Sequence, residues 1–374
     1  MTSVRTYRFP AIDRVVHGAG SIARVPRMLN ELSAQRVVVL SGRTLATKTP
    51  LVRQLVTAIG ARHAGTFAEI RQHAPKNDID RAVQFCRDVG ADCIVGFGGS
   101  SVTDAAKIIA VRLLGDELPQ RAMPQILIPT TLSAGEYTPA SGMTGDVPGI
   151  KTYVVDPRMA PFAVVLDPEV TLATPMDLWL STGVKCLEHA CEMMWSPRSH
   201  PVATALAREA LSIVHHNLPI TARDPDDLDA RAQCQLAGWM SMSGVSNVQV
   251  YLSHTLGHQI GARWGIPHGI TSGITLGPVM RHLSTSAPMA MLQIAVALGV
   301  ADHDTAPSDA CLAGAAEIEA FVQQLGLPTR LRDVGAIAAD FAEVAVATQA
   351  AGHATGFGDG FGAQLIEALL REMW

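Results

Sequence analysis

The chain has 374 residues, a formal net charge of −5, and 48% hydrophobic against 17% charged residues. This length suits about two domains, and so apolar a composition excludes a disordered or fibrous protein. No apolar run approaches the roughly 18 residues of a membrane span, and no long basic run occurs. A transmembrane protein is therefore excluded, and small molecules are favoured over nucleic acid or a membrane surface as partners.

Two features of the sequence predict a cytoplasmic protein. The first residues lack the apolar core of a secretory signal. The six cysteines are few for this length and include no Cys-x-x-Cys pair. We therefore expect reduced structural thiols rather than a disulfide framework or a thiolate zinc site.

Short β-branched runs alternate with helical patterns in the first part of the chain. Strands are expected at residues 36–40, 66–70, 92–97 and 125–129, and helices at 50–59, 77–89 and 101–114. Such alternation predicts a Rossmann-like α/β domain, a parallel sheet with helices on both faces. After Pro168, Ala/Leu/Met-rich amphipathic segments replace the β-branched runs. We therefore predict an α/β domain over residues 1–167 and an all-α domain over residues 168–374.

The first long helix of the second domain has clear sequence boundaries. Thr174 is a suitable N-cap, and Pro175 suits the first helical position. Pro197 should end the helix soon after Trp195.

The segment GFGGSSVTDAAK, residues 96–107, joins a predicted strand to a predicted helix. Gly98 and Gly99 would let backbone N–H groups approach a phosphate at the helix N-terminus, so the segment is a candidate diphosphate cradle. It lacks the third glycine of a GxGxxG fingerprint and the Gly-Lys-Ser/Thr of a Walker A loop. A glycine-rich turn can also be purely structural, but open α/β sheets bind ligands at the carboxyl ends of their strands.

A second loop, PTTLSAGEYTPASGMT at residues 129–144, also leaves a predicted strand. The hydroxyls of Thr130, Thr131 and Ser133 are suited to bond a nucleotide's phosphate or sugar. This signal is weak by itself, since hydroxyl-rich loops are usually only turns.

Histidines gather in the predicted helical domain. Lys185 and His189 are four residues apart and share a helix face, His254 and His258 repeat that spacing, and His268 follows in an Ile-Pro-His-Gly turn. Such a set suits a metal site, a proton relay or a pocket for an anionic substrate. The pair His254 and His258 is not a metalloprotease signature, because no Glu follows the first His.

Four segments in order, GGSSVTDAAK, PTTLSAGEYT, TGVKCLEHACE and HTLGHQIG followed by IPHG, resemble the group III, iron-containing alcohol dehydrogenase family. Residues 150–175 are most similar to its maleylacetate reductase branch. The resemblance implies the dehydroquinate synthase-like fold, with an α/β nucleotide domain before a helical domain. It also implies NAD(H) or NADP(H) as the cofactor, and we expect a homodimer.

The metal site that the resemblance implies is altered in this chain. Metal-dependent members hold the ion with one Asp and three His, and the Asp position is occupied here by Lys185. A metal, if present, would lie on His189, His254 and His268. Because an ammonium repels a cation and cannot ligate it, we expect no metal. Lys185 would instead polarise a carbonyl or bind a carboxylate, unless it only pairs with a neighbouring glutamate, Glu188 or Glu192.

The cofactor residues are also expected from the resemblance. The family often carries an Asp after the first nucleotide-fold strand, where this sequence has Gly42 with Arg43 beside it. Without that carboxylate, NADPH should be accepted. We expect further cofactor contacts from Ser100, Asp104 and Lys151.

The function expected from the resemblance is reduction of a small oxo acid by NAD(P)H. Maleylacetate is the leading substrate, and its activated carbon–carbon double bond would be reduced to give 3-oxoadipate. His254, His258 and His268 would supply protons and electrostatic stabilisation beside Lys185. Two alternatives stay open: a metal-dependent alcohol dehydrogenase or aldehyde reductase, and a nucleotide-binding protein without catalysis.

Overall fold

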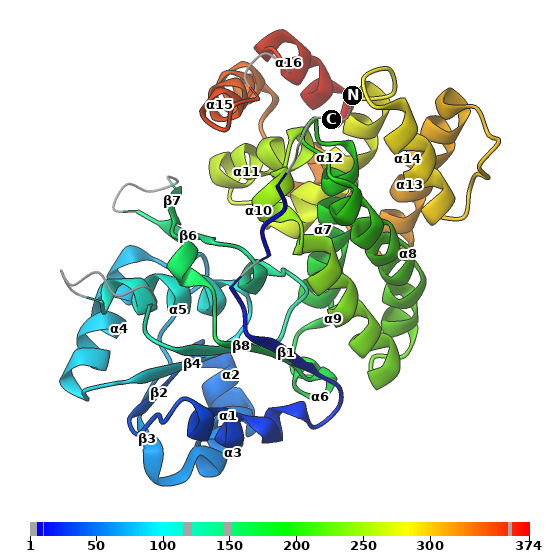
Figure 1. Cartoon of the computed structure of the whole chain (residues 1–374). Coiled ribbons are helices and arrows are strands. Elements are labelled where there is room, and N and C mark those ends of the chain that lie inside the picture. The colour runs from blue at the N-terminus through cyan, green and yellow to red at the C-terminus, as the bar shows by residue number, and fades with distance from the viewer. Residues whose placement is uncertain (1–5, 10, 115–121, 146–150, 358–360) are drawn as a thin grey trace. The chain divides into compact units, whose positions relative to one another are not determined.

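The computed structural model describes residues 6–9, 11–114, 122–145, 151–357 and 361–374 (Figure 1). The chain forms two compact units. The α/β unit comprises Phe9–Pro175 and Asp226–Gln235, and the helical unit comprises Met1–Arg8, Met176–Pro225 and Leu236–Trp374. The α/β unit thus continues beyond the expected boundary at residue 167, through the short helix α6 (Pro168–Thr171).

A parallel six-stranded sheet forms the centre of the α/β unit, which confirms the predicted fold class. Its strand order is β1-β8-β5-β4-β2-β3. The strands expected from the sequence are β2 (Val37–Ser41), β3 (His63–Phe67), β4 (Cys93–Gly98) and β5 (Gln125–Pro129). Strand β3 begins at His63 rather than at residue 66. The sequence analysis did not identify β1 (Arg14–His17), β8 (Ala163–Leu166), or the antiparallel hairpin of β6 (Ala140–Thr144) and β7 (Lys151–Val155).

Helices cover both faces of this sheet (Figure 1). Alternate strand residues face opposite sides, so Val38 and Leu40 pack in one core and Val37 and Val39 in the other. Burial on both faces explains why the strands read as continuous hydrophobic runs rather than as alternating ones. The helices of the unit are α1 (Val25–Glu31), α2 (Arg43–Lys48), α3 (Leu51–Ile59), α4 (Lys76–Asp88), α5 (Ser100–Arg112) and α6.

The strand register places three loops at one edge of the sheet. Ser41 of β2 pairs with Phe97 of β4, and Gly98 pairs with Pro129 of β5. The segments that follow Ser41, Gly98 and Pro129 therefore leave the sheet together, at the carboxyl ends of adjacent parallel strands. This is the edge at which open α/β sheets bind ligands.

The helical unit is built around α7 (Met176–Trp195), whose end agrees with the sequence prediction. The other helices are α8 (Pro201–Arg223), α9 (Leu228–Met242, whose first residues belong to the α/β unit), α10 (Val245–Val248), α11 (Leu252–Trp264), α12 (His268–His282), α13 (Pro288–Ala297), α14 (Pro307–Gln324), α15 (Phe341–Ala354) and α16 (Ala363–Glu372). No helix in the described ranges is both long and apolar enough to cross a bilayer.

The close packing of α12 against α7 depends on a glycine, Gly269. A Cβ atom at Gly269 would lie 2.1 Å from the carbonyl oxygen of Ser181 on α7, so only glycine permits this approach. The start of α12, with His268, is thereby held beside the helix that carries Lys185 and His189.

Candidate active site

The glycine turn between β4 and α5 has no room for side chains. A Cβ atom at Gly98 would lie 2.8 Å from Val102 Cγ2, and one at Gly99 would lie 3.1 Å from Thr131 Cγ2. Gly99 is the N-cap of α5, and no side chain caps this helix. The turn and the hydroxyl loop are therefore in contact at an uncapped helix N-terminus, a geometry that fits a phosphate.

The hydroxyl loop lies beside this turn. Thr130 donates its N–H to the Gly98 carbonyl at 3.0 Å. The hydroxyls of Thr131 and Ser133 are buried and 3.3 Å apart. Asp104 is one turn into α5, with Oδ1 3.8 Å from where a Cβ of Gly135 would lie. The predicted cofactor residues of these two segments thus lie together.

Gly42 and Arg43 follow β2 at the same sheet edge. Gly42 is the N-cap of α2, and Arg43 is its first, exposed residue. The next strand ends near a carboxylate that the sequence analysis did not consider, Glu69, which pairs with Arg81. Lys151 begins β7 and pairs there with Thr144.

Lys107 is a buried residue of this region that the sequence analysis missed. Its ammonium donates to the carbonyls of Gly135 and Ala140, both at 2.7 Å, and to the Thr138 hydroxyl at 3.2 Å. Burial lowers the pKa of Lys107 to about 8. Lys107 thereby links α5 to residues 135–140 of the hydroxyl loop.

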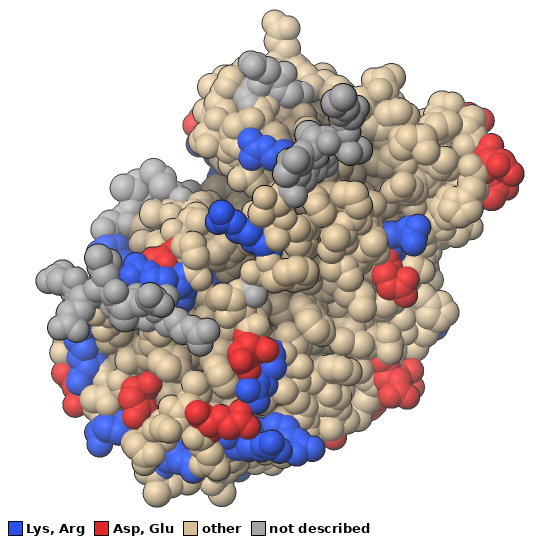
Figure 2. Space-filling model, viewed as in Figure 1, with Lys and Arg blue, Asp and Glu red and all other residues tan. Residues whose placement is uncertain are grey.

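The surface of the α/β unit carries charges of both signs. Figure 2 shows Lys and Arg side chains interspersed with Asp and Glu on the face in view. Some form ion pairs, such as Arg14 with Asp13 and with Glu31. This pattern agrees with the small-molecule partner expected from the composition.

Four imidazoles cluster in the helical unit. The ring centroids of His254, His258 and His268 lie 4.4 to 4.6 Å apart, and His189 lies 5.3 Å from His254. The i, i+4 spacing on α11 and the approach of α12 to α7 bring these rings together. The histidines grouped from the sequence therefore meet in one place.

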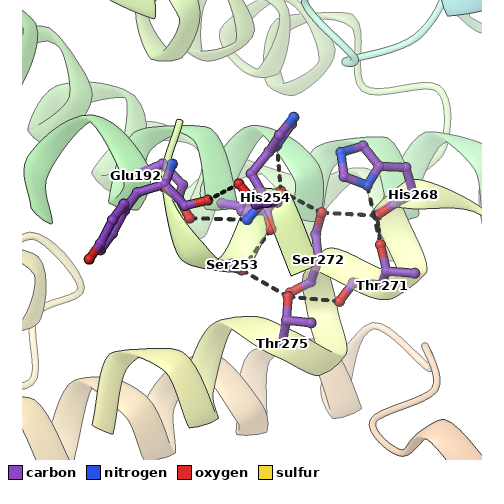
Figure 3. A network of polar contacts seen from close by, with 10 residues as sticks. Glu192, Ser253, His254, His268, Thr271, Ser272 and Thr275 are labelled. Carbon is purple, nitrogen blue, oxygen red and sulfur yellow. Dashed lines mark hydrogen bonds and ion pairs between the residues drawn. The ribbon is translucent and has the colours of Figure 1, made fainter. Parts of the chain in front are cut away.

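Two buried glutamates of α7 contact His254, and one of them, Glu192, is labelled beside it in Figure 3. Glu188 accepts hydrogen bonds from Ser253 Oγ and Ser272 Oγ, both at 2.7 Å, and is 3.3 Å from His254 Nδ1. Glu192 accepts from the main-chain N–H groups of Tyr251 and His254. The sequence analysis considered these glutamates only as partners of Lys185.

The environment of the glutamates separates their pKa values. Burial would raise the pKa of Glu188. The hydrogen bond and charge of His254, with the hydrogen bonds of Ser253 and Ser272, outweigh this effect and lower the pKa. Burial, with the charge of Glu188 nearby, raises the pKa of Glu192 to about 8. Glu188 is thus the ionised member of the pair at neutral pH.

Lys185 acts electrostatically on the same cluster. Desolvation and then the charge of Lys185 hold the pKa values of His189 and His268 well below the usual range. Among the described residues, neither ring nitrogen of His189 has a hydrogen-bond partner, nor has Nε2 of His268. Neutral, unsatisfied imidazoles beside an ammonium suit a polar, anionic ligand.

These shifts predict a loss of stability in acid. Below about pH 6.5 the unfolded chain binds protons at His189 and His268 that the folded chain does not, so the free energy of unfolding falls as the pH falls. His189→Gln should reduce the slope between pH 6.5 and 5.5 by about 1 kcal/mol per pH unit. Urea unfolding measures it, with His303→Gln, at an exposed loop position, as the control. An unchanged slope in His189→Gln would contradict the assignment.

The possible metal ligands of the histidine cluster form two sets. Two sets bring ligand atoms within 4.8 Å of one another: His254, His258 and His268; and Glu188, His189 and His254. Glu188 already has three donors, and Lys185 adds a positive charge that disfavours a cation. The residues present therefore do not fit a site of one carboxylate and three imidazoles.

The six cysteines are all free and buried. Burial raises the pKa of the Cys86, Cys93 and Cys186 thiols to about 12, so they are not nucleophiles at neutral pH. This agrees with the structural role predicted for them.

A parallel sheet whose carboxyl edge carries an uncapped glycine turn and a hydroxyl loop is typical of nucleotide-binding enzymes, and this chain is of that class. Residues 13–168 match the family described as iron-containing alcohol dehydrogenase, and residues 179–374 match the C-terminal part of the Fe-containing alcohol dehydrogenase family. The chain belongs to the iron-containing alcohol dehydrogenase family, as its motifs indicated. It is an NAD(P)-dependent oxidoreductase.

Individual relatives point to one branch of this family. A maleylacetate reductase of Sphingobium indicum is 31% identical over 319 residues, which cover 85% of this chain and 86% of that protein. Maleylacetate reductase 2 of Cupriavidus pinatubonensis is 32% identical over 286 residues, 76% of each chain. The crystal structure of maleylacetate reductase from Agrobacterium tumefaciens is similar with a TM-score of 0.84, at 28% identity and 99% coverage of both chains.

Proposed function

We propose that this protein is a metal-independent, NAD(P)H-dependent maleylacetate reductase. The observation that carries the proposal is Lys185 close to His189 and His268, whose pKa values its charge helps to lower, in a chain whose relatives include maleylacetate reductases. Maleylacetate carries two carboxylates and a ketone conjugated to a carbon–carbon double bond. The ammonium of Lys185 and the imidazole N–H groups near it can bind these carboxylate and ketone oxygens without a bound metal.

The chemistry needs a hydride, a site for negative charge and a proton. A nicotinamide held by the glycine turn and the hydroxyl loop would supply the hydride, which the double-bond carbon farther from the ketone would accept. Lys185 stabilises the enolate oxygen that develops at the ketone, or holds a substrate carboxylate. His254 or His258 delivers the proton to the other carbon, which completes 3-oxoadipate, whereas His268, with its lowered pKa, stays neutral.

Turnover tests this function directly. Purified protein should oxidise NAD(P)H only when maleylacetate is added and should form 3-oxoadipate in equal amount, measured by absorbance and by product analysis. Turnover of simple aldehydes without turnover of maleylacetate would contradict the proposal. A homodimer and a cytoplasmic location belong to the same proposal, and sedimentation tests the first.

We expect NADPH to be used at least comparably to NADH. Gly42 offers no carboxylate to repel a 2′-phosphate, and the exposed Arg43 provides charge-assisted donors. The ratio of kcat/KM for the two cofactors measures this. A preference for NADH above about a hundredfold, equal to about 2.7 kcal/mol, would mean that other groups, such as Glu69, exclude the phosphate.

A metal-dependent alcohol dehydrogenase is the second candidate, favoured by the three close ligand atoms of His254, His258 and His268. Metal analysis distinguishes the two. We expect less than stoichiometric iron or zinc and activity that survives chelation, because Lys185 disfavours a cation. About one tightly bound metal per chain, with activity lost on chelation and restored by that metal, would favour the second candidate.

A further inference from the structure

Glu188 is a charged side chain with no solvent exposure, at the point where three helices meet. It lies on α7, and its donors Ser253, His254 and Ser272 come from α11 and α12. Figure 3 shows Ser253 and Ser272 close to His254, with Thr275 drawn below the two serines. Thr275 Oγ1 is 2.8 Å from Ser253 Oγ, so the serine itself is held.

The partners of Glu188 determine which hydrogen atoms are present. A carboxylate has no proton to donate, so each of its three neighbours must donate to it. His254 can satisfy this only with a hydrogen on Nδ1. In a neutral imidazole the other nitrogen, Nε2, then carries the lone pair. Glu188 thus dictates both the plane and the tautomer of this ring.

We propose that Glu188 is the positioning residue of His254: it holds the ring as the Nδ1–H tautomer, so that proton uptake and release in the reaction occur at Nε2. His189 and His268 are not held in this way, since neither ring nitrogen of His189 is bonded to any described residue and Nδ1 of His268 contacts Thr271 Oγ1 at 3.2 Å. The kinetic part of the inference rests on the proposed function.

Glu192 provides a matched comparison. It lies one turn further along α7 and is equally buried, but it contacts His254 through the main-chain N–H at 3.1 Å rather than through the ring. Replacing this side chain leaves the ring nitrogens with the same neighbours. Loss of a buried carboxylate from α7 can thereby be separated from loss of the contact with the ring.

Glu188→Gln should reverse the tautomer. Ser253 donates to Oε1, so the amide oxygen is expected at that position. The NH₂ group then occupies the place of Oε2 and faces Ser272 and His254 Nδ1. Ser272 can rotate to accept, but Nδ1 can accept only without its hydrogen, which moves to Nε2.

Two measurements test the inference on the full-length protein. Histidine-selective ¹⁵N labelling and long-range ¹H–¹⁵N spectra at about pH 8 identify the tautomer, with His254 assigned from the spectrum of His254→Gln. We expect Nδ1–H in the wild type and in Glu192→Gln, and Nε2–H in Glu188→Gln. Steady-state kinetics should show a kcat reduced about tenfold to a hundredfold in Glu188→Gln, with KM for NADPH within about threefold.

The inference is overturned if wild-type His254 is the Nε2–H tautomer, a result that requires no variant to fold. It is also overturned if Glu188→Gln keeps the Nδ1–H tautomer, or changes tautomer while kcat stays at the wild-type value. If the wild type fails to reduce maleylacetate, the proposed function fails, but the tautomers still decide whether Glu188 positions the ring.

Discussion

Replacing Lys185 by methionine is expected to lower kcat for maleylacetate by about a hundredfold, with the affinity for NADPH nearly unchanged. Methionine has a similar length but no charge, so it removes the cation that would stabilise the enolate oxygen. Loss of one such donor typically costs about 2.7 to 4 kcal/mol of transition-state stabilisation. Steady-state kinetics with varied maleylacetate and varied NADPH measures both effects.

The kinetic pattern separates the roles open to Lys185. If the ammonium only anchors a substrate carboxylate, KM for maleylacetate rises while kcat is retained. If both constants stay within a few-fold and only thermal stability falls, the residue is structural and the mechanism is wrong. Lys48→Met, an exposed lysine at the end of α2, is the control for a general loss of charge.

Much of the α/β fold could be predicted because its signals are local. Strands β2, β4 and β5 are largely apolar runs, buried at every residue in the structure, and so stand out in the sequence. Strand β1 is short, with Arg14 and His17 exposed, and it depends on pairing with β8, nearly 150 residues later. Such pairing leaves no local pattern.

The histidine cluster was predictable for the same reason, since His254 and His258 share a helix face by their spacing. The partner of His254 was not. Glu188 lies three residues after Lys185, which suggests a local pair, but α11 and α12 bring Ser253, His254 and Ser272 to it instead. Contacts between residues 65 to 84 positions apart are set by helix packing, which spacing does not encode.

Gly269→Ala is expected to lower the free energy of unfolding by about 3 kcal/mol and to reduce kcat. Alanine is ordinarily the better helix residue by about 1 kcal/mol, so propensity alone predicts the opposite sign. At this position the added Cβ would lie 2.1 Å from the Ser181 carbonyl oxygen, and backbone cannot yield as the end of a flexible side chain can. The start of α12 must move away from α7, and overpacking of this kind typically costs about 1 to 3 kcal/mol.

The same movement should disturb the candidate active site. His268 precedes Gly269, and its ring lies 4.6 Å from that of His254, so displacing α12 separates the imidazoles. The matched control is Gly362→Ala at the N-cap of α16, where a Cβ meets no atom within 4 Å. Urea unfolding and maleylacetate kinetics on both variants measure the effects. Equal stability and kcat in the two variants would mean that α12 does not depend on its close approach to α7.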